Sequence, residues 1–307
     1  MLQATDLSVE FASRGRRARA VDGVNLTVGA GEIVALVGES GCGKTTLART
    51  LLGLERPAGG EVRYAGAPLS YRPRDLKAYR RKVQLVLQDP TGSLNPRQTV
   101  YEAVAEGPRI HGLPNEEEVV AEALSRAGLR PPERFFLRYP HELSGGQRQR
   151  VVIAGALALK PDVLIADEPV ASLDASVRGE ILALLLRLRD ELGLSALVVT
   201  HDLGLAWNIA DRVAVMYLGR IVESGPTEQV LQDPQHPYTQ ALLSVLPESQ
   251  QKIVLTGEPP DPTRIPSGCR FHPRCQLVMA ECSTTPLAVL PAVDDHQAAC
   301  LLLKLGR

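Results

Sequence analysis

The sequence predicts an α/β fold with a parallel sheet, and three apolar runs carry this prediction. Val163–Ala166 and Ala196–Thr200 have the composition of buried strands and are separated by a helical segment with an apolar face. The earlier run Ile33–Val37 is followed by a glycine-rich loop and then by a helical segment. Strands that alternate with helices in this way are typical of a parallel sheet covered by helices.

The rest of the chain divides by composition into three further parts. Residues 1–37 alternate short β-rich runs with glycine turns, and a helical period dominates at about 89–160. From residue 233 onward the chain is rich in Pro, Gln, Thr and Cys and has weak periodicity. We therefore expect one domain at 1–232, with a helical subdomain inserted at about 89–160, and a small C-terminal appendage at 233–307.

Charge and hydropathy exclude some classes of protein. The 307 residues include 34 Lys and Arg against 35 Asp and Glu, a formal net charge of −1, so no global field attracts nucleic acid. The apolar runs are shorter than the roughly 20 residues that span a bilayer. The first ten residues lack the pattern of a secretory signal. We expect a cytoplasmic protein that does not bind nucleic acid.

One segment has the pattern of a phosphate-binding loop. Residues 38–45, Gly38-Glu39-Ser40-Gly41-Cys42-Gly43-Lys44-Thr45, satisfy G-x-x-x-x-G-K-[ST] between a predicted strand and a predicted helix. The glycines let backbone N–H groups turn toward phosphates, and the helix N-terminus adds partial positive charge. Lys44 would reach the β- and γ-phosphates, while the Thr45 hydroxyl would ligate Mg²⁺. The segment, with Thr46, predicts an ATP site; an ordinary glycine turn is the weaker interpretation.

Two adjacent carboxylates follow the next buried run. Asp167 and Glu168 stand at its C-terminal end, which is the edge where open α/β sheets bind ligands. We expect Asp167 to hold the hydration shell of Mg²⁺ and Glu168 to polarise the attacking water as a general base. His201 ends the following run and could contact the γ-phosphate. Without the phosphate-binding loop, the two carboxylates would be interpreted as a solvated acidic turn and His201 as a structural histidine.

A further segment adds a family resemblance. Leu143-Ser144-Gly145-Gly146-Gln147 resembles the signature sequence of ABC ATPases, and other motifs follow in that family's order. Gln88 resembles the Q-loop glutamine, Ser172-Leu173-Asp174 the D-loop, and His201 the switch histidine; Phe11 is near the position of the aromatic residue that stacks on adenine. Over residues 1–232 the resemblance implies a P-loop NTPase (RecA-like) core with an antiparallel β-subdomain and a helical subdomain. The small C-terminal appendage expected from composition completes the predicted fold.

The resemblance also implies a mechanism and partners. Lys44, Glu168 and His201 would be catalytic in Mg²⁺-dependent ATP hydrolysis, and Thr45 and Gln88 would contact the metal. Two ATPase subunits, paralogues in this branch, would pack head to tail. The ATP of one would contact the partner's signature residues, Ser144, Gly145, Gly146 and Gln147, beside the D-loop residue Asp174. Two membrane-spanning permease subunits and an extracytoplasmic solute-binding protein would complete a transporter, with the ATPases on the cytoplasmic face of the inner membrane.

Three shorter segments resemble a narrower branch, the oligopeptide and dipeptide importers, which include nickel importers. They are Asp89-Pro90 with Ser93-Leu94-Asn95-Pro96-Arg97, His236-Pro237-Tyr238-Thr239, and Gly268-Cys269-Arg270-Phe271-His272-Pro273-Arg274-Cys275. They imply import of peptides or a related solute. The alternative function is a soluble ABC ATPase acting on DNA or the ribosome, which the near-neutral charge disfavours. A regulatory metal sensor is a third interpretation.

Four cysteines near the C-terminus predict a metal site. Cys269, Cys275, Cys282 and Cys300 have the spacing C-x5-C-x6-C-x17-C, which matches neither a zinc ribbon nor a plant-type ferredoxin. Some importers of this branch carry a [4Fe–4S] cluster there, so the resemblance implies one. Zinc, with His272 or His296 replacing a cysteine, and free thiols are the alternatives. Separately, Arg14, Arg16, Arg17 and Arg19 form a basic patch that could meet anionic lipid or a membrane subunit, or be a solvated hairpin tip.

Overall fold

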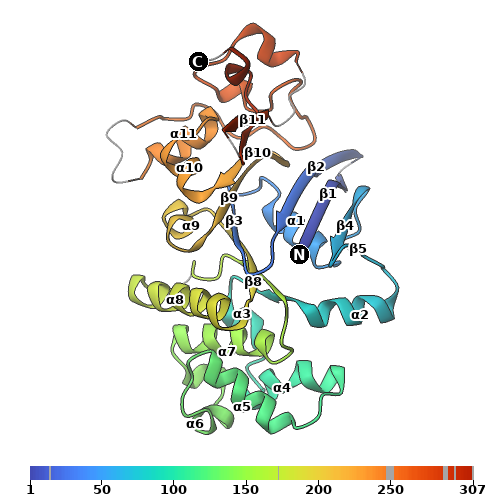
Figure 1. The fold of residues 1–307 in the computed structure, drawn as a ribbon, viewed down its shortest axis with the longest axis vertical. Helices are drawn as coiled ribbons and strands as arrows, with labels where there is room; N and C mark the ends of the chain where they lie inside the picture. The colour runs from blue at the N-terminus through green and yellow to red at the C-terminus, as the bar shows by residue number, and fades with distance from the viewer. Residues whose placement is uncertain (14, 172, 247–251, 286–289, 294, 306–307) are drawn as a thin grey trace. The chain divides into compact units, whose positions relative to one another are not determined.

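The computed structural model describes residues 1–13, 15–171, 173–246, 252–285, 290–293 and 295–305. These residues form two compact units. Unit 1 contains residues 1–28, 34–69 and 200–307, and unit 2 contains residues 29–33 and 70–199. Figure 1 labels the helices and strands of both units.

Unit 1 begins with an antiparallel sheet of strand order β2-β1-β4-β5. Its strands are β1 (Leu2–Ser13), β2 (Arg16–Val28), β4 (Gly59–Tyr64) and β5 (Ala67–Pro68). Alternate residues of β1, such as Leu7 and Val9, are buried, because one face of an antiparallel sheet packs on the core. This sheet is the predicted antiparallel β-subdomain.

The second sheet of unit 1 contains the strand that precedes the phosphate-binding loop. β3 (Ile33–Val37) is fully buried and pairs in parallel with β9 (Arg212–Tyr217). The order continues through β10 (Arg220–Pro226), β12 (His296–Ala298) and β11 (Leu290–Val293), all antiparallel. The helices are α1 (Lys44–Leu51), α9 (Leu203–Ile209), α10 (Thr227–Gln232) and α11 (Pro237–Ser244), with 3-10 turns η2 (His272–Arg274), η3 (Ala280–Ser283) and η4 (Leu301–Leu305). The appendage therefore contributes strands to a sheet of this unit.

Unit 2 contains three parallel strands in the order β6-β7-β8. They are β6 (Val83–Val86), β7 (Val163–Asp167) and β8 (Ser195–Thr200). α2 (Pro73–Lys82) precedes β6, and α8 (Ala175–Leu192) connects β7 to β8. Buried residues of α8, including Ile181, Leu184 and Leu188, recur at helical spacing, so one face of this helix packs on the core.

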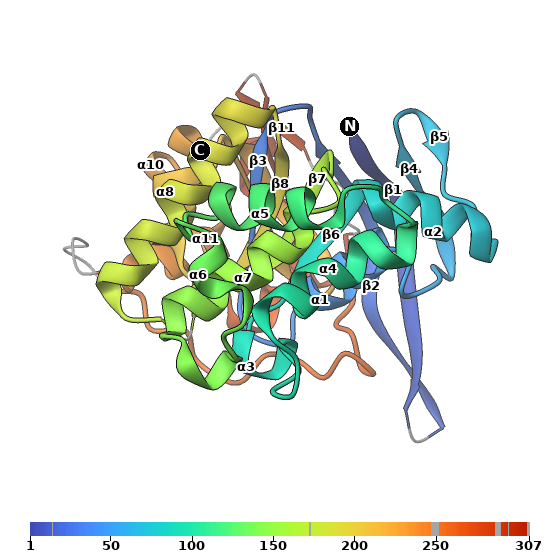
Figure 2. The same ribbon diagram turned by 90° about the horizontal axis from the view of Figure 1, so that it is seen from below.

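The helical part of unit 2 lies between β6 and β7 in the sequence. It contains α3 (Pro90–Ser93), α4 (Val100–His111), α5 (Glu116–Arg126), α6 (Glu133–Phe136), η1 (Pro140–Glu142) and α7 (Gly145–Leu157). Figure 2 shows α4, α5 and α7 side by side, and they share an apolar cluster that includes Val104, Leu124 and Val151. Thr99 and Glu102 form a capping box that fixes where α4 begins.

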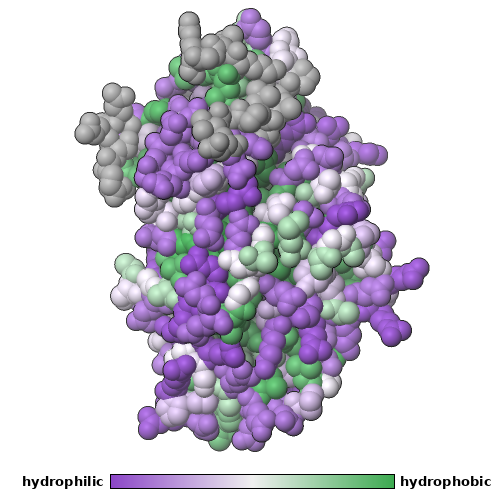
Figure 3. Space-filling model, viewed as in Figure 1, coloured by the Kyte–Doolittle hydropathy of each residue, from purple (hydrophilic) through white to green (hydrophobic). Residues whose placement is uncertain are grey.

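These elements confirm the predicted α/β fold. The runs predicted as strands at 33–37, 163–166 and 196–200 are β3, β7 and β8, with ends that differ by at most one residue. Among the helices that the structure describes, none combines the length and the apolar character that a membrane span needs. On the face drawn in Figure 3, hydrophobic residues form small areas between hydrophilic ones.

Candidate nucleotide site

The phosphate-binding loop connects β3 to α1 within unit 1, and its glycines have conformations that other residues resist. Gly38, Gly41 and Gly43 have φ of 154°, 78° and 108°. A Cβ at Gly38 would lie 2.2 Å from the carbonyl oxygen of Met216, and one at Gly43 would lie 2.0 Å from that of Ala20. Both backbones approach too closely for a side chain, so the loop needs glycine at these two positions.

Lys44 begins α1 and its ammonium group lies inside the loop. Its side chain is buried, and Nζ donates to the carbonyl oxygens of Gly38 at 2.7 Å and Glu39 at 2.9 Å. Nζ also lies 3.8 Å from Cys42 Sγ, and burial raises the pKa of that thiol, so Cys42 is neutral. A positive charge held at the N-terminus of a helix, in a glycine-rich loop, fits a polyphosphate.

The other predicted residues of unit 1 occupy different elements. Thr45 is exposed in the first turn of α1, and Thr46 is half-buried beside it. Ser40 is also exposed, at the turn of the loop. Phe11 lies on β1 opposite Ala18 and is 40% exposed, and His201 is exposed just before α9. An exposed ring and an exposed hydroxyl are both accessible to a ligand.

In unit 2 the structure brings Gln88 and Glu168 together. Gln88 follows β6 and Glu168 follows β7; because these strands are parallel neighbours, their carboxyl ends meet. The Nε2 atom of Gln88 lies 3.4 Å from Oε2 of Glu168. Glu168 has φ of 46°, and its N–H donates to the carbonyl oxygen of Val199 at 2.8 Å. Asp167, the last residue of β7, is half-buried. The sheet edge therefore presents two acids and an amide.

The signature segment forms the N-terminus of α7. Ser144 caps this helix: its Oγ accepts from the N–H of Gln147 at 3.2 Å, and its N–H donates to Oε1 of Gln147 at 3.0 Å. This reciprocal pair uses the backbone N–H groups of Ser144 and Gln147. The N–H groups of the two glycines between them lie in the first turn, at the N-terminal end of the helix. A Cβ at Gly145 would be 3.5 Å from Leu173, so the signature packs against the D-loop segment.

The D-loop residue Asp174 caps the neighbouring helix. Its carboxylate accepts from the N–H of Val177 at 3.0 Å and from the hydroxyl of Ser176 at 2.9 Å. The hydrogen bond from the Val177 backbone lowers the pKa of Asp174, so it stays ionised at the N-terminus of α8. Ser172, predicted with it, lies outside the described residues.

Comparison with known proteins decides the family. The family descriptions "ABC transporter" and "Oligopeptide/dipeptide transporter, C-terminal region" match residues 21–171 and 222–282. The dipeptide transport ATP-binding protein DppF of Escherichia coli is 45% identical over 298 residues, which are 92% of this chain and 89% of DppF. DppF of Haemophilus influenzae is 44% identical, over 94% of this chain and 90% of its own. The chain belongs to the ATP-binding proteins of ABC transporters.

Solved structures agree with this family. The chain resembles cbiO1 from Clostridium perfringens, part of the ABC transporter complex cbiONQ, with a TM-score of 0.69 and 32% identity over 76% of this chain and 90% of cbiO1. It resembles the dimeric ATP-binding cassette MJ0796, in a post-hydrolysis state bound to ADP and Pi, with a TM-score of 0.66 and 31% identity over 74% and 99%. The predicted P-loop NTPase fold is confirmed, and the chain is an ATP-hydrolysing ABC transporter subunit.

The prediction of a [4Fe–4S] cluster in this ABC ATPase, held by Cys269, Cys275, Cys282 and Cys300, is wrong. Within the described ranges, no group of three or more His, Cys, Asp and Glu side chains is arranged to hold a metal ion, which also opposes the zinc alternative. Burial raises the pKa of Cys269, Cys275 and Cys300, so these thiols are neutral. Cys269 and Cys275 instead pack against the apolar cluster that contains Phe271.

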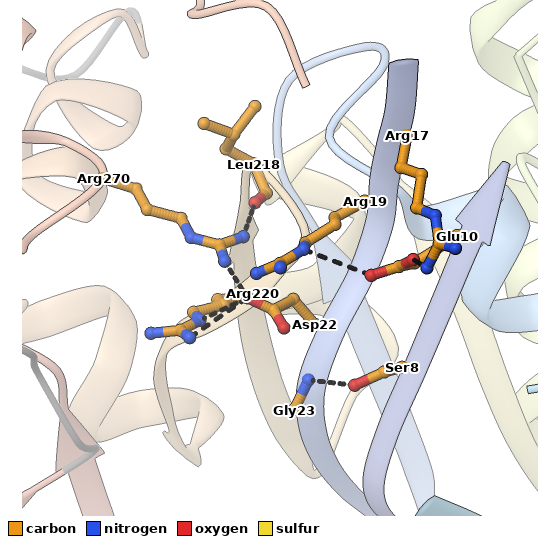
Figure 4. A network of polar contacts seen from close by, with 9 residues as sticks. All are labelled: Ser8, Glu10, Arg17, Arg19, Asp22, Gly23, Leu218, Arg220 and Arg270. Atoms are coloured by element: carbon orange, nitrogen blue, oxygen red, sulfur yellow. Dashed lines mark hydrogen bonds and ion pairs between the residues drawn. The ribbon is translucent and has the colours of Figure 1, made fainter. Parts of the chain in front are cut away.

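The predicted basic patch is part of a strand pair of this ABC ATPase, with acidic partners nearby (Figure 4). Arg17 and Arg19 lie on β2 and pair with Glu10 on β1 at 3.4 and 3.2 Å. Arg14 lies outside the described residues. Farther along β2, Asp22 binds the guanidinium groups of Arg220 and Arg270; burial acts to raise the pKa of Asp22, but the two arginines outweigh it and lower that pKa.

Two residues of the C-terminal tail, residues 233–307, contact the phosphate-binding loop but were not predicted as site residues. Arg274 and Tyr238 both form hydrogen bonds with Glu39. The segments that contain them were singled out in the sequence for their resemblance to the peptide-importer branch, without a role being assigned to either residue. Nothing in their spacing predicts a contact with a loop about 200 residues earlier.

Proposed function

We propose that this chain is the ATPase subunit of an importer of dipeptides or oligopeptides. One observation carries the proposal: the same chain contains the phosphate-binding loop of an ABC transporter and a match to the C-terminal region of oligopeptide/dipeptide transporters at residues 222–282. The two relatives named DppF are dipeptide transport ATP-binding proteins, and each aligns with more than nine tenths of this chain. The comparisons give no support to a role on DNA or the ribosome.

The loop residues would bind the nucleotide. The Gly38 to Thr45 amides and the Lys44 ammonium group would hold the β- and γ-phosphates, and the buried position of Lys44 supports this role. The Thr45 hydroxyl, Gln88 and Asp167 are oxygen donors of the kind that Mg²⁺ prefers. The metal would neutralise charge on the phosphates. Phe11 would stack on the adenine ring.

Glu168 would act as the general base. Its carboxylate would accept the proton of the attacking water, and the nearby Gln88 amide supports this role by orienting the carboxylate. His201 would contact the γ-phosphate. Positioning and charge, more than bond chemistry by the protein, would account for most of the rate enhancement.

The signature residues would serve a second subunit. Ser144, Gly145, Gly146 and Gln147 stand at a helix N-terminus, a suitable place for the γ-phosphate of the partner's ATP, and Asp174 would line the same interface. We propose a head-to-tail pair of ATPases, with a paralogue as partner, bound to two permease subunits on the cytoplasmic face of the inner membrane. An extracytoplasmic solute-binding protein would deliver the peptide. The ATPase core would be residues 1–232 and the appendage 233–307.

Reconstitution tests this proposal. The chain, its partner ATPase and the permeases would be placed in liposomes. Labelled dipeptide and the solute-binding protein would be added on the side of the membrane opposite to the ATPases. We expect uptake of the labelled dipeptide that needs Mg²⁺ and ATP and that decreases when unlabelled oligopeptide is added as a competitor. Uptake of Ni²⁺ in place of peptide, or no ATP-driven uptake, would contradict it.

A further inference from the structure

The phosphate-binding loop contains an acidic side chain, Glu39, that an arginine of the C-terminal tail holds. The guanidinium of Arg274 donates from Nη1 to Oε2 of Glu39 at 2.8 Å and from Nη2 to Oε1 at 3.1 Å. The side chain of Arg274 is 6% exposed and that of Glu39 is 27% exposed. This bidentate geometry is the strong form of an arginine–carboxylate pair, and the pair is largely shielded from solvent.

Arg274 is itself fixed by an aromatic cluster. Its guanidinium carbon lies 5.9 Å from the ring centre of Tyr217, and the rings of Tyr217, Tyr238 and Phe271 lie 4.7 to 5.4 Å from one another. All three rings are nearly fully buried. Tyr217 ends β9, while Tyr238 and Phe271 belong to the tail. The tail is therefore firmly packed next to Arg274.

A second tail residue holds the backbone of the same loop residue. The N–H of Glu39 donates to the hydroxyl oxygen of Tyr238 at 2.9 Å. Burial raises the pKa of Tyr238, so the phenol remains neutral and adds no charge beside the phosphate-binding loop. The same peptide unit contains the carbonyl oxygen of Gly38, which accepts from Lys44 Nζ at 2.7 Å, so the tail holds the N–H end of a peptide unit whose other end Lys44 contacts.

We propose that Arg274 is a positioning residue of the nucleotide site, which neutralises Glu39 so that the loop can accept a polyanion. A bare carboxylate one residue after Gly38 would repel the phosphates of ATP and would compete for Lys44. Arg274 removes this charge and holds the carboxylate in place. The residue lies in the oligopeptide/dipeptide C-terminal region and acts on a loop within the ABC transporter region. Tail and ATP affinity are thereby coupled.

This inference rests on the proposed function, and the test uses the complete transporter assembled from full-length chains. Arg274→Met removes the charge and keeps most of the side-chain length, and Glu39→Gln removes the partner charge. We expect Arg274→Met to raise the KM for ATP about tenfold with kcat changed less than twofold. Glu39→Gln alone should change KM less than threefold. The double variant should return KM to within threefold of the wild type, because no unpaired carboxylate remains.

The double variant separates the charge role from a purely structural one. If the tail only stabilises the fold, Arg274→Met and the double variant will be equally impaired, and the inference is overturned. A normal KM in Arg274→Met also overturns it. Arg270→Met is the matched control, since Arg270 is an equally buried tail arginine that pairs with Asp22 instead of the loop, and its KM should stay normal.

A further variant distinguishes failure of this inference from failure of the proposed function. Lys44→Ala should abolish ATP binding if the loop binds the nucleotide at all. If Lys44→Ala binds ATP normally, the proposed function itself fails. If Lys44→Ala loses binding while Arg274→Met has a normal KM, the inference alone fails.

Discussion

Nε2 of Gln88 lies 3.4 Å from Oε2 of Glu168, although the two residues are 80 positions apart in the chain. The contact follows from strand pairing: Val86 lies opposite Ala166 in the β6–β7 register, so the segments that leave the two strands start side by side. An amide beside the carboxylate restricts the orientation of Glu168 without neutralising its charge. That arrangement suits a general base.

Glu168→Gln should separate hydrolysis from binding. The glutamine has the same shape and keeps a contact with Gln88, but it cannot accept the proton of water. We expect phosphate release to fall by about 10²–10⁴-fold, while ATP affinity stays within a few-fold of the wild type and the closed dimer accumulates. Phosphate release and equilibrium ATP titration measure both. Glu191→Gln, on the exposed face of α8, is the control, and unchanged turnover in Glu168→Gln would refute the assigned role.

Gly146→Ala should destabilise the helix pair α7 and α8. A Cβ at this position would lie 2.5 Å from Cγ1 of Val177, so the valine side chain or one of the helices must shift. We expect the free energy of unfolding to fall by about 1–3 kcal/mol, measured with urea. In a Val177→Ala background the same substitution should cost clearly less, because the clashing methyl is gone. Equal costs in the two backgrounds would show that the packing is looser than described.

Gly43→Ala and Gly15→Ala compare crowding with backbone strain. Both glycines have positive φ, 108° and 78°, but only at Gly43 would a Cβ meet a backbone atom, the Ala20 carbonyl oxygen at 2.0 Å. We expect Gly15→Ala to cost only the strain of the left-handed conformation, about 1–2 kcal/mol, and to leave ATP affinity unchanged. Gly43→Ala should weaken ATP binding at least tenfold, by titration calorimetry. Equal ATP affinities in the two variants would contradict this.

Because His236 is buried, we expect the folded chain to lose stability in acid. Its Nδ1 accepts from the N–H of Tyr238 at 3.1 Å and caps α11, and burial lowers its pKa from 6.5 to about 3. The unfolded chain therefore binds the proton first, so the stabilisation is complete above pH 6.5 and is lost as the pH falls toward 3. One proton gives a slope of at most about 1.4 kcal/mol per pH unit.

Comparison of His236→Asn with the wild type isolates the contribution of His236 to the pH dependence of stability. Asparagine also caps helices and does not titrate, so the other ionisable groups cancel in the difference between the two proteins. We expect the wild type to lose more stability than His236→Asn between pH 7 and pH 4.5 in urea unfolding. Parallel pH profiles would mean that His236 binds its proton equally well in the folded and the unfolded chain, which would contradict the lowered pKa.

The parts of the fold that local sequence determines were predicted well. The strand at 33–37, the glycine-rich loop and the start of α1 follow from apolar runs and glycine spacing within 20 residues. The carboxylates at 167 and 168 could be assigned to a sheet edge because they end a buried run. Ser144 and Asp174 are both helix caps, a role that short polar side chains before a helix usually have.

Contacts between distant segments could not be predicted. Arg274 and Glu39 are 235 residues apart, and neither the charge of one nor the spacing around the other points to its partner. The tail cysteines failed for the related reason that spacing along a chain does not fix the distances between sulfur atoms or their protonation. The positions of the side chains in the described part of the chain, which depend on packing with Phe271 and its neighbours, decided the outcome.

ATP-driven uptake of labelled dipeptide by the reconstituted transporter, compared between the wild-type chain and Glu168→Gln, tests the central claim most directly. The account predicts uptake with the wild-type chain and none above background with Glu168→Gln, although both bind ATP. Equal uptake in the two samples, or no dependence on ATP in the wild type, would contradict the assignment of this chain as the ATPase that energises import.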